Sequence, residues 1–301
     1  MPSISGSENR IFAIAQEGPD QERGVQIKVA RQIGAKRIEI LDTIALEEPL
    51  EIRLSYCDRG QRFTRSIALI MRTPGKDRAL AAGFLFTEGI IDDPACIDSM
   101  LTEVPNHEVP NSRTSVILVV LGEHASPQIP AESRAFFVNS GCGVCGKASL
   151  LSLRATCPAR KANQFKVTPD LLFQLPKKLR MAQPEFSRTG GLHAIGLFDN
   201  SGTLIKCAED VGRHNAMDKV IGEMFLEDDS PLHNAIFVLS GRASFELLQK
   251  SVRVGISMVV AIGAPSSLAL RIAQEFDITL VGFLNGERFN VYHGKERIFL
   301  S

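Results

Sequence analysis

The fold of this chain is decided by residues 235–283, AIFVLSGRASFELLQKSVRVGISMVVAIGAPSSLALRIAQEFDITLVGF. The stretch contains three short apolar runs, at 235–239, 258–262 and 279–283. Near-continuous apolar runs of this length are typical of strands buried on both faces. Between the runs, apolar residues recur every three or four positions, which predicts amphipathic helices near 244–252 and 266–274. Strands that alternate with helices in this way predict parallel β-α-β units, in which helices cover a sheet.

The segments before this stretch predict a second, smaller unit. Alternation of apolar and polar residues predicts strands at 50–56 and 61–72, and a further strand is expected at 115–121. A helix through Leu80 and Leu85 is expected to end at Gly89. We therefore expect an α/β chain (α+β overall), with a loose polar tail at 1–30, an N-terminal α+β domain at 31–132 and a C-terminal domain at 133–301.

The composition is that of a globular chain without a dominant charge. Lys and Arg together number 34, as do Asp and Glu, in 301 residues. A formal net charge of zero argues against a general electrostatic interaction with nucleic acid or with an anionic membrane. The longest apolar stretch is far shorter than the roughly 20 residues of a spanning helix, and the first residues lack the apolar core of an export signal. We therefore expect a cytoplasmic protein.

Cys142 and Cys145 form the motif with the clearest chemistry, CGVC. They lie between a strand predicted at 135–138 and the start of a predicted helix. The amide groups at a helix N-terminus stabilise a thiolate, and Lys147 adds positive charge. Because the thiolate is the reactive form of cysteine, this position favours nucleophilic sulfur chemistry.

Three other interpretations of the cysteine pair stay open from the residues alone. The pair could be half of a structural zinc site, although the sequence has no second CxxC or paired histidines to complete four ligands. It could be a thioredoxin-type dithiol switch, which has the same strand–CxxC–helix context. It could also be a buried structural pair, although the three glycines around it suit exposure better than packing.

Glycine-bearing loops beside strands are the second candidate feature. Ligands of α/β sheets bind at the carboxyl ends of the strands, and helix N-termini attract phosphate. The predicted loops are 188–193 with Gly190 and Gly191, 240–244 with Arg242, and 263–266. Arg242 could bind an anion through two N–H groups. Together the loops favour one anionic, nucleotide-like ligand, although each is also explained by a tight turn.

Two further segments could line the same site. A helix is expected through 215–225, after a hairpin at 193–208. If Asp210 already belongs to this helix, the side chains of Asp210, His214 and Asp218 share one face of it. His214 would then be able to titrate near neutrality as part of a polar wall of the site. The spacing alone favours a capped helix start with solvated charges. The segment after the last parallel strand could stack on a base and bind a phosphate, or form a turn between two edge strands. Its residues are Phe283, Leu284, Asn285, Gly286, Glu287, Arg288 and Phe289.

These motifs together resemble one known family. They are CGVCGKAS at 142–149, TGGLHA at 189–194, EDVGRHNAMDKVIG at 209–222, SGRASFELLQK at 240–250 and GAPSSLA at 263–269. With TPGKDRALAAGFLFTEGII at 73–91, they resemble the FdhD family, the formate dehydrogenase accessory sulfurtransferases, in order and over roughly residues 35–295.

The resemblance implies a sulfur carrier. Proteins of this family accept sulfane sulfur from a cysteine desulfurase as a persulfide on the CxxC pair. They pass it to the molybdenum bis(molybdopterin guanine dinucleotide) cofactor before that cofactor enters formate dehydrogenase. The resemblance implies Cys142 as the persulfide carrier, Cys145 as the partner thiol, cofactor binding at 283–289 and a homodimer. It also implies a C-terminal domain of cytidine-deaminase-like, three-layer α/β/α architecture.

The resemblance to deaminases does not extend to their chemistry. A zinc deaminase needs an H-x-E motif, and none of the 6 histidines is followed two positions later by Glu. We therefore expect no bound metal and a pocket for the guanine dinucleotide lined by Arg242, His214 and the segment 283–288. The alternative function is a chaperone that holds the cofactor and uses its CxxC as a redox latch.

Overall fold

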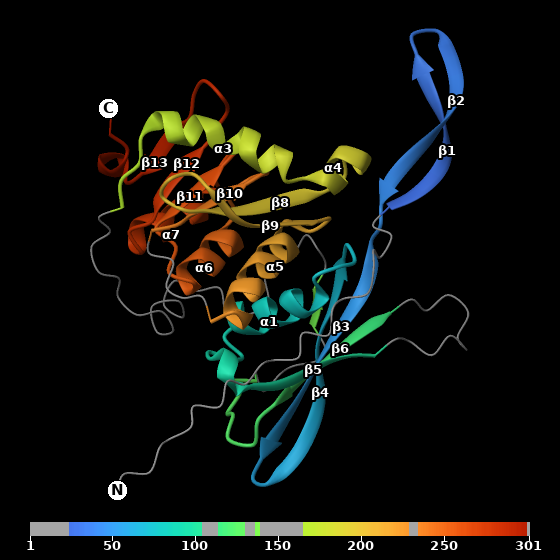
Figure 1. Ribbon diagram of the computed structural model, residues 1–301, viewed down its shortest axis with the longest axis vertical. Helices are drawn as coiled ribbons and strands as arrows, with labels where there is room; N and C mark the ends of the chain where they lie inside the picture. Colours follow the sequence, from blue (N-terminus) through green and yellow to red (C-terminus); the bar gives the residue numbers. More distant parts are fainter. Residues whose placement is uncertain (1–23, 104–113, 130–135, 139–164, 229–233, 300–301) are drawn as a thin grey trace, which may run out of the picture.

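The computed structural model describes residues 24–103, 114–129, 136–138, 165–228 and 234–299. They form a six-stranded sheet, a five-stranded sheet and a separate two-stranded ribbon (Figure 1). Helices lie between the two larger sheets, and the ribbon projects from one side of the molecule. The mixed α/β class predicted from the sequence is confirmed.

The six-stranded sheet has the strand order β13-β12-β11-β10-β8-β9. Its three central strands run parallel, as predicted: β10 (Ile236–Leu239), β11 (Met258–Ala261) and β12 (Thr279–Gly282). The predicted hairpin is also present and pairs antiparallel with β10; its strands are β8 (His193–Phe198) and β9 (Leu204–Asp210). The short strand β13 (Asn290–His293) closes the opposite edge, antiparallel to β12.

Helices cover both faces of this sheet and give it three layers. One face packs against α3 (Pro169–Met181), and the other against α5 (Arg213–Leu226), α6 (Phe245–Arg253) and α7 (Ser267–Glu275). Successive residues of a strand point to opposite faces. In β10, Ile236 and Val238 accordingly pack with α3, whereas Phe237 and Leu239 pack with the helices of the other layer. Burial on both faces explains why the three predicted strands are almost entirely apolar.

The N-terminal half contains the five-stranded sheet, in the order β5-β6-β3-β4-β7. The strands β3 (Glu48–Asp58), β4 (Gln61–Arg72) and β6 (Ser115–Leu121) and the helix α1 (Asp77–Thr87) lie where the sequence predicts them. Helix α1 packs on one face of the sheet. Strand β5 (Ile97–Glu103), which follows the 3-10 turn η1 (Pro94–Cys96), was not predicted from the sequence. A second such turn is η2 (Lys295–Arg297).

The strand predicted at 135–138 is present as β7 (Phe136–Val138), but it pairs in parallel with β4. It therefore extends the five-stranded sheet of the N-terminal half. The boundary expected after residue 132 would separate this strand from the sheet to which it belongs. A gap between apolar segments marks a break in secondary structure, whereas the sheet that a strand joins depends on long-range pairing.

Two glycines let α1 and α5 cross at backbone contact and so join the two halves. A Cβ at Gly83 would lie 2.0 Å from the Asp218 carbonyl oxygen, and one at Gly222 would lie 1.8 Å from that of Ala79. A side chain at either position would overlap the facing helix. Figure 1 shows this pair of helices between the two sheets.

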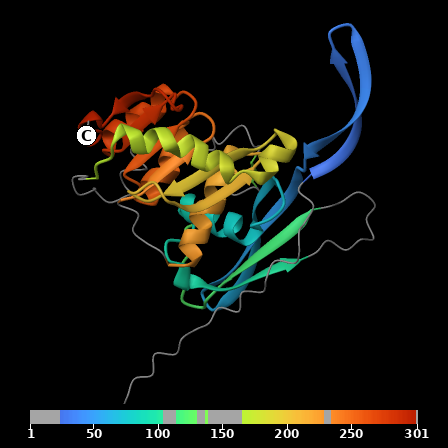
Figure 2. The ribbon, with the colours of Figure 1, turned by 45° about the horizontal axis from the view of Figure 1, so that its top comes forward.

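The ribbon consists of β1 (Gly24–Ile33) and β2 (Lys36–Ala45), which pair antiparallel along their whole length. The expectation of a loose tail through residue 30 is therefore wrong for residues 24–30. The short helix α4 (Pro184–Thr189) packs against the base of the ribbon. Figure 2 shows from a second direction that the rest of the ribbon extends away from the molecule.

Candidate functional site

The candidate site lies at one edge of the six-stranded sheet, where loops from several strands meet. The carboxyl ends of β10, β11 and β12 share this edge because these strands are parallel. Strand β8 runs antiparallel to β10, so His193 at its start lies at the same edge, paired with Asp210 at the end of β9. The topology therefore brings together loops that are far apart in the sequence, as expected for a ligand site of an α/β sheet.

Backbone hydrogen bonds hold the loops after β10, β11 and β12 against one another. The Gly263 amide donates to the Gly241 carbonyl at 2.9 Å, and the Ala243 amide donates to the Ala264 carbonyl at 3.1 Å. The Phe283 amide donates to the Gly263 carbonyl at 3.1 Å. A Cβ on Gly263 would lie only 3.0 Å from the Gly241 oxygen, so the close approach of these loops requires glycine there. The edge is thus a rigid platform.

Two arginines make this edge locally positive. Burial lowers the pKa of His193, and the positive charges of Arg213 and Arg242 lower it further. Arg242 is exposed, whereas the Nε atom of Arg213 is buried and has no hydrogen-bond partner among the described residues. A neutral imidazole near two guanidinium groups can donate or accept a hydrogen bond beside an anion. This arrangement suits an anionic ligand.

Arg213 was not predicted as an individual site residue. It lies within the motif at 209–222, in which only Asp210, His214 and Asp218 were candidates. The signal that could have found it is its place at the first turn of α5, directly after a strand end, where helix N-termini face anions.

His214 does not titrate near neutrality as expected. Burial lowers its pKa to about 4, and the nearby charges of Arg213 and Lys250 act in the same direction. Its Nε2 atom lies 3.5 Å from the Ser244 hydroxyl oxygen and 3.7 Å from a Glu246 carboxylate oxygen. His214 is therefore a neutral side chain at physiological pH, beside the loop that carries Arg242.

Asp210 and Asp218 do not share an open helix face with His214. Asp210 is the last residue of β9, and its buried carboxylate pairs with Lys219 Nζ at 2.8 Å. Asp218 is also buried and pairs with Lys250 Nζ at 2.9 Å. Both acids are structural, and the expectation of solvated charges is wrong for them as well.

The segment 283–289 connects β12 to β13 at the same edge. Phe283 has a φ of 56° and is 45% exposed, a costly conformation for a bulky side chain. Its exposed neighbours are Asn285, Gly286, Glu287 and Arg288. The Asn285 side-chain oxygen accepts hydrogen bonds from the Glu287 and Arg288 amides, both at 2.9 Å. The segment is a fixed turn between two strands with an exposed aromatic ring, which is compatible with both sequence interpretations.

Two residues of this segment have packing roles. Leu284 is only 1% exposed and belongs to the core beneath α3, so its side chain is not available to a ligand. Phe289 lies with its ring centroid 5.4 Å from that of Phe173 on α3. The exposed positions of the segment are therefore its better candidates for ligand contact.

Gly190 and Gly191 lie immediately before β8, both exposed. Gly190 ends α4 with a φ of 66°, the left-handed conformation that favours glycine at a helix end. A Cβ on Gly191 would lie 3.5 Å from that of Ala45, at the base of the ribbon. Their positions explain them as turn residues and leave their backbone accessible.

Cys142, Cys145 and the helix predicted after them lie outside the described residues. The chain before them ends in β7, which runs parallel to β4. Strand β4 continues into Thr73, whose amide donates to the Asp210 carboxylate at 3.1 Å and whose hydroxyl accepts from the Val211 amide at 3.2 Å. The described part of the N-terminal half therefore reaches the same edge of the six-stranded sheet.

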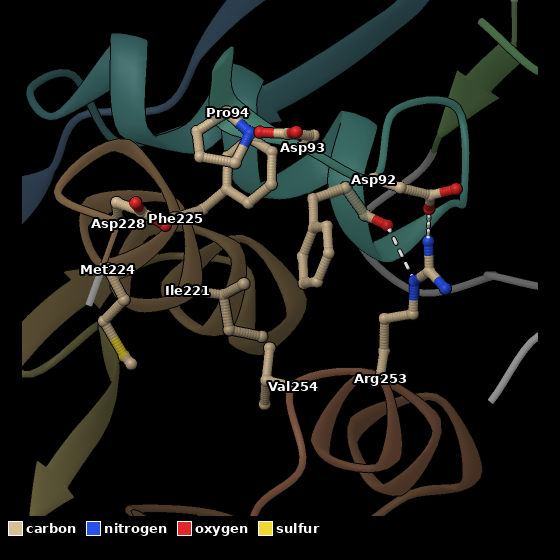
Figure 3. A pocket seen from close by; sticks show the side chains of 10 residues that line it. Asp92, Asp93, Pro94, Ile221, Met224, Phe225, Asp228, Arg253 and Val254 are labelled. Carbon is tan, nitrogen blue, oxygen red and sulfur yellow. Dashed lines mark hydrogen bonds and ion pairs between the residues drawn. The ribbon is translucent and has the colours of Figure 1, made fainter. Parts of the chain in front are cut away.

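A cavity of about 450 Å³ lies away from this edge. Figure 3 shows it among the side chains of Ile221, Met224 and Phe225, with Arg253 bound to Asp92 beside it. It lies at the C-terminal ends of α5 and α6, whereas the candidate site faces the other ends of these helices. The length of α5 separates the two by about 20 Å. No predicted site residue lines the cavity.

Comparisons with known proteins identify the family. The sequence profile of the FdhD/NarQ family matches residues 45–299. The chain belongs to the FdhD/NarQ family. The matched range begins near the end of the ribbon and includes both halves, so the family resemblance inferred from the motifs is confirmed.

Several relatives in the FdhD/NarQ family carry the name "Sulfur carrier protein FdhD". One from Streptomyces coelicolor is 44% identical over 263 residues, covering 86% of this chain and 90% of the relative. One from Saccharolobus solfataricus is 40% identical over 279 residues, covering 92% and 100%. A crystal structure from Desulfotalea psychrophila, described as a formate dehydrogenase accessory protein, has a TM-score of 0.68 at 27% identity, and covers 92% of this chain and 100% of that one.

Proposed function

We propose that this chain is a cytoplasmic sulfur carrier that transfers persulfide sulfur to the molybdenum bis(molybdopterin guanine dinucleotide) cofactor of formate dehydrogenase. The observation that carries the proposal is family membership over residues 45–299, a range that contains Cys142 and Cys145. Relatives of similar length are named sulfur carrier proteins. In the described residues, no helix is long and apolar enough to cross a membrane.

The sulfur transfer step uses the two cysteines of this chain, a persulfide donor and a low-molecular-weight thiol as reductant. The Cys142 thiolate attacks the outer sulfur of a persulfide on a cysteine desulfurase, takes that sulfur, and leaves the donor as a thiolate. Attack of the Cys145 thiolate on the inner sulfur of Cys142 then forms a disulfide and releases the outer sulfur as hydrosulfide. The two electrons that reduce this sulfur come from the pair of cysteines, which is oxidised from two thiols to one disulfide. A low-molecular-weight thiol restores the pair, as the reducing cytoplasm allows.

The cargo is proposed to bind at the edge of the six-stranded sheet. Arg242 and Arg213 supply positive charge for the phosphates of the guanine dinucleotide, and neutral His214 lies beside the same loop. Phe283 offers an exposed ring for a base. A net charge of zero fits this function, because the attraction to one anionic ligand is local.

The carrier role is tested by intact mass after incubation with a cysteine desulfurase and cysteine, without reductant. Wild type, Cys142→Ser and Cys145→Ser are compared. Cys207→Ser is the matched control, because burial raises the pKa of the Cys207 thiol to about 12. One added sulfur atom is expected to persist in Cys145→Ser, which has no second thiol to release it, and to be absent from Cys142→Ser, while the Cys207→Ser control should behave as wild type does. Absence of added sulfur in every form, with a reversible Cys142–Cys145 disulfide, would favour the cofactor chaperone instead.

The cargo site is tested separately by calorimetric titration with guanosine diphosphate. Arg242→Ala is expected to weaken binding by about 10-fold or more, as loss of a charge-assisted contact typically costs more than 1 kcal/mol. Arg271→Ala is the matched control, since Arg271 is an exposed arginine on α7. Equal affinity of wild type and Arg242→Ala would remove Arg242 from the site.

A further inference from the structure

The cavity shown in Figure 3 lies at the junction of the two halves of the molecule, away from the candidate site. Phe86 at the end of α1 and residues 92–94 line it from the N-terminal half, and the ends of α5 and α6 line it from the C-terminal half. Its volume of about 450 Å³ is in the range of small-molecule sites, which often lie at such junctions. The cavity therefore has the size and the position of a ligand site.

The interior of the cavity is apolar and partly aromatic. Ile221, Met224 and Phe225 come from the last two turns of α5, and Val254 follows α6 (Figure 3). The rings of Phe225 and Phe86 stack with their centroids 4.7 Å apart. Phe225 is only 9% exposed and Ile221 only 1%, so the cavity is recessed below the surface. Apolar walls in a recess favour a ligand with an apolar body, because binding removes both surfaces from water.

The rim of the cavity is acidic. Asp92, Asp93 and Asp228 are exposed, and among the described lining residues Arg253 alone carries a positive charge. Arg253 is already engaged, because it donates to the Asp92 carboxylate and its Nε atom donates to the Phe86 carbonyl at 3.3 Å. Asp93 and Asp228 form no ion pair with a described residue. Three carboxylates against one guanidinium leave the rim with an excess of negative charge.

Three helices also end at this cavity. Helix α1 ends at Thr87, α5 at Leu226 and α6 at Arg253, and a residue in the last turn of each lines the cavity. A helix C-terminus carries a partial negative charge of about half an elementary charge, because its last carbonyl groups lack helical partners. The backbone therefore adds negative potential of the same sign as the rim. This contribution is independent of the exposed aspartates, whose charges are screened by salt.

We propose that this cavity binds a small organic cation. The apolar body of the ligand packs on Ile221, Met224 and Phe225. Its ammonium or guanidinium group lies at the rim, beside the carboxylates of Asp93 and Asp228. An anion would meet these carboxylates and three helix C-termini, which repel it. A recess below the surface suits a small molecule better than the broad surface of another protein.

The cavity and the candidate site differ in the charge of the ligand that they favour. The arginines at the sheet edge suit an anion, whereas the acidic rim and the helix ends suit a cation. No residue of the cavity takes part in the proposed sulfur transfer. Binding of a cation and transfer of sulfur can therefore succeed or fail separately.

The test is a titration of the full chain followed by NMR of isotope-labelled methionine methyl groups. Met224 lines the cavity, whereas Met181 on α3 is 77% exposed and serves as the control signal; Met224→Leu and Met181→Leu assign the two signals. The probe is phenethylamine, and phenethyl alcohol and phenylpropionate are its neutral and anionic counterparts. Phenethylamine is expected to shift the Met224 signal saturably, with a dissociation constant on the order of 1 mM, and to leave the Met181 signal in place. It should bind about 5-fold or more tightly than the alcohol, and more tightly still than phenylpropionate.

Substitutions separate the charge of the rim from the shape of the recess. Asp93→Asn with Asp228→Asn removes two charges, while asparagine can still cap η1 and adopt the φ of 54° at position 228. This variant should bind phenethylamine about 5-fold or more weakly. Asp170→Asn, which removes an exposed acid on α3, is the matched control and should bind as wild type does. Val254→Phe fills the recess and should abolish binding of both the amine and the alcohol.

A Met224 signal that phenethylamine does not move at about 10 mM would overturn the proposal. So would equal affinities for the amine and the alcohol or for the amine and phenylpropionate, since the charge would then not matter. A shift of the Met181 signal as large as that of Met224, or an equal loss of affinity in Asp170→Asn, would show general binding to the surface. Binding that survives Val254→Phe would place the probe outside the cavity.

Discussion

Replacement of Gly222 by alanine is expected to force apart the two helices that join the halves of the molecule. The new Cβ would lie 1.8 Å from the Ala79 carbonyl oxygen and 2.7 Å from the Gly83 amide nitrogen. Real Cβ atoms essentially never come within 3.0 Å of such atoms, so the contact must lengthen by at least 1.2 Å. Both obstacles are backbone atoms, and a side-chain rotation cannot relieve them. Helix α1 has to move as a unit.

The expected cost follows from what this movement disrupts. Overpacking of a core typically costs about 1–3 kcal/mol. The Thr87 hydroxyl donates a buried hydrogen bond of 2.9 Å to Asp218 between the same two helices, and its loss costs about 1–3 kcal/mol more. Alanine is favoured over glycine in a helix by about 1 kcal/mol, which offsets part of this. The net destabilisation is therefore about 2–5 kcal/mol, or a melting temperature lower by roughly 5–15 °C.

Thermal unfolding followed by circular dichroism measures this effect. Gly286→Ala is the matched control, because a Cβ there would meet nothing within 4 Å, and it should melt within about 2 °C of wild type. The reasoning about the helix crossing would be refuted if Gly222→Ala melted at or above the wild-type temperature, since helix propensity alone predicts that result.

Three other outcomes are expected. Lys250→Met leaves the Asp218 carboxylate buried without its cation and should lower the free energy of unfolding, measured in urea, by about 3–5 kcal/mol. Asp218→Asn in the same chain should restore most of this loss, and equal stability of the single and double variants would contradict the expectation. The pKa of His214 is about 4 in the folded chain and near 6.5 in the unfolded chain, so the unfolded state binds more protons between these two pH values. The free energy of unfolding should therefore fall as the pH drops from about 6.5 to 4, by at most about 3 kcal/mol from this histidine. His214→Gln should lose that component, and pH profiles of unfolding that are parallel for variant and wild type would show that the histidine does not contribute. Burial raises the pKa of the Cys207 thiol to about 12, so this cysteine should react with iodoacetamide at pH 8 only after the chain is unfolded. Peptide mass mapping measures the labelling, and labelling of the native chain at the rate of a free cysteine would contradict the burial of Cys207.

The central sheet and its helices were predictable from the sequence because burial leaves a strong local signal. Strands β10, β11 and β12 are covered on both faces, so their apolar runs stand out from the amphipathic helices between them. The ribbon has a readable signal as well, the alternation of Val25, Ile27 and Val29, although the expected polar tail at 1–30 included these residues. The sheet to which β7 belongs could not be read locally, since pairing partners are chosen by contacts between distant segments.

The candidate site also has features that the sequence predicts and features that depend on contacts between distant segments. The sequence by itself determined the fold class, the family, the cysteine pair and the glycine-bearing loops, because these depend on residue identity and local spacing. Only the tertiary structure decided the states of the polar side chains. Asp210 and Asp218 are buried ion-pair partners, and His214 is neutral, because distant segments that carry Thr73, Thr87 and Lys250 pack around them. Burial and neighbouring charge set a protonation state, and both arise only when the chain is folded.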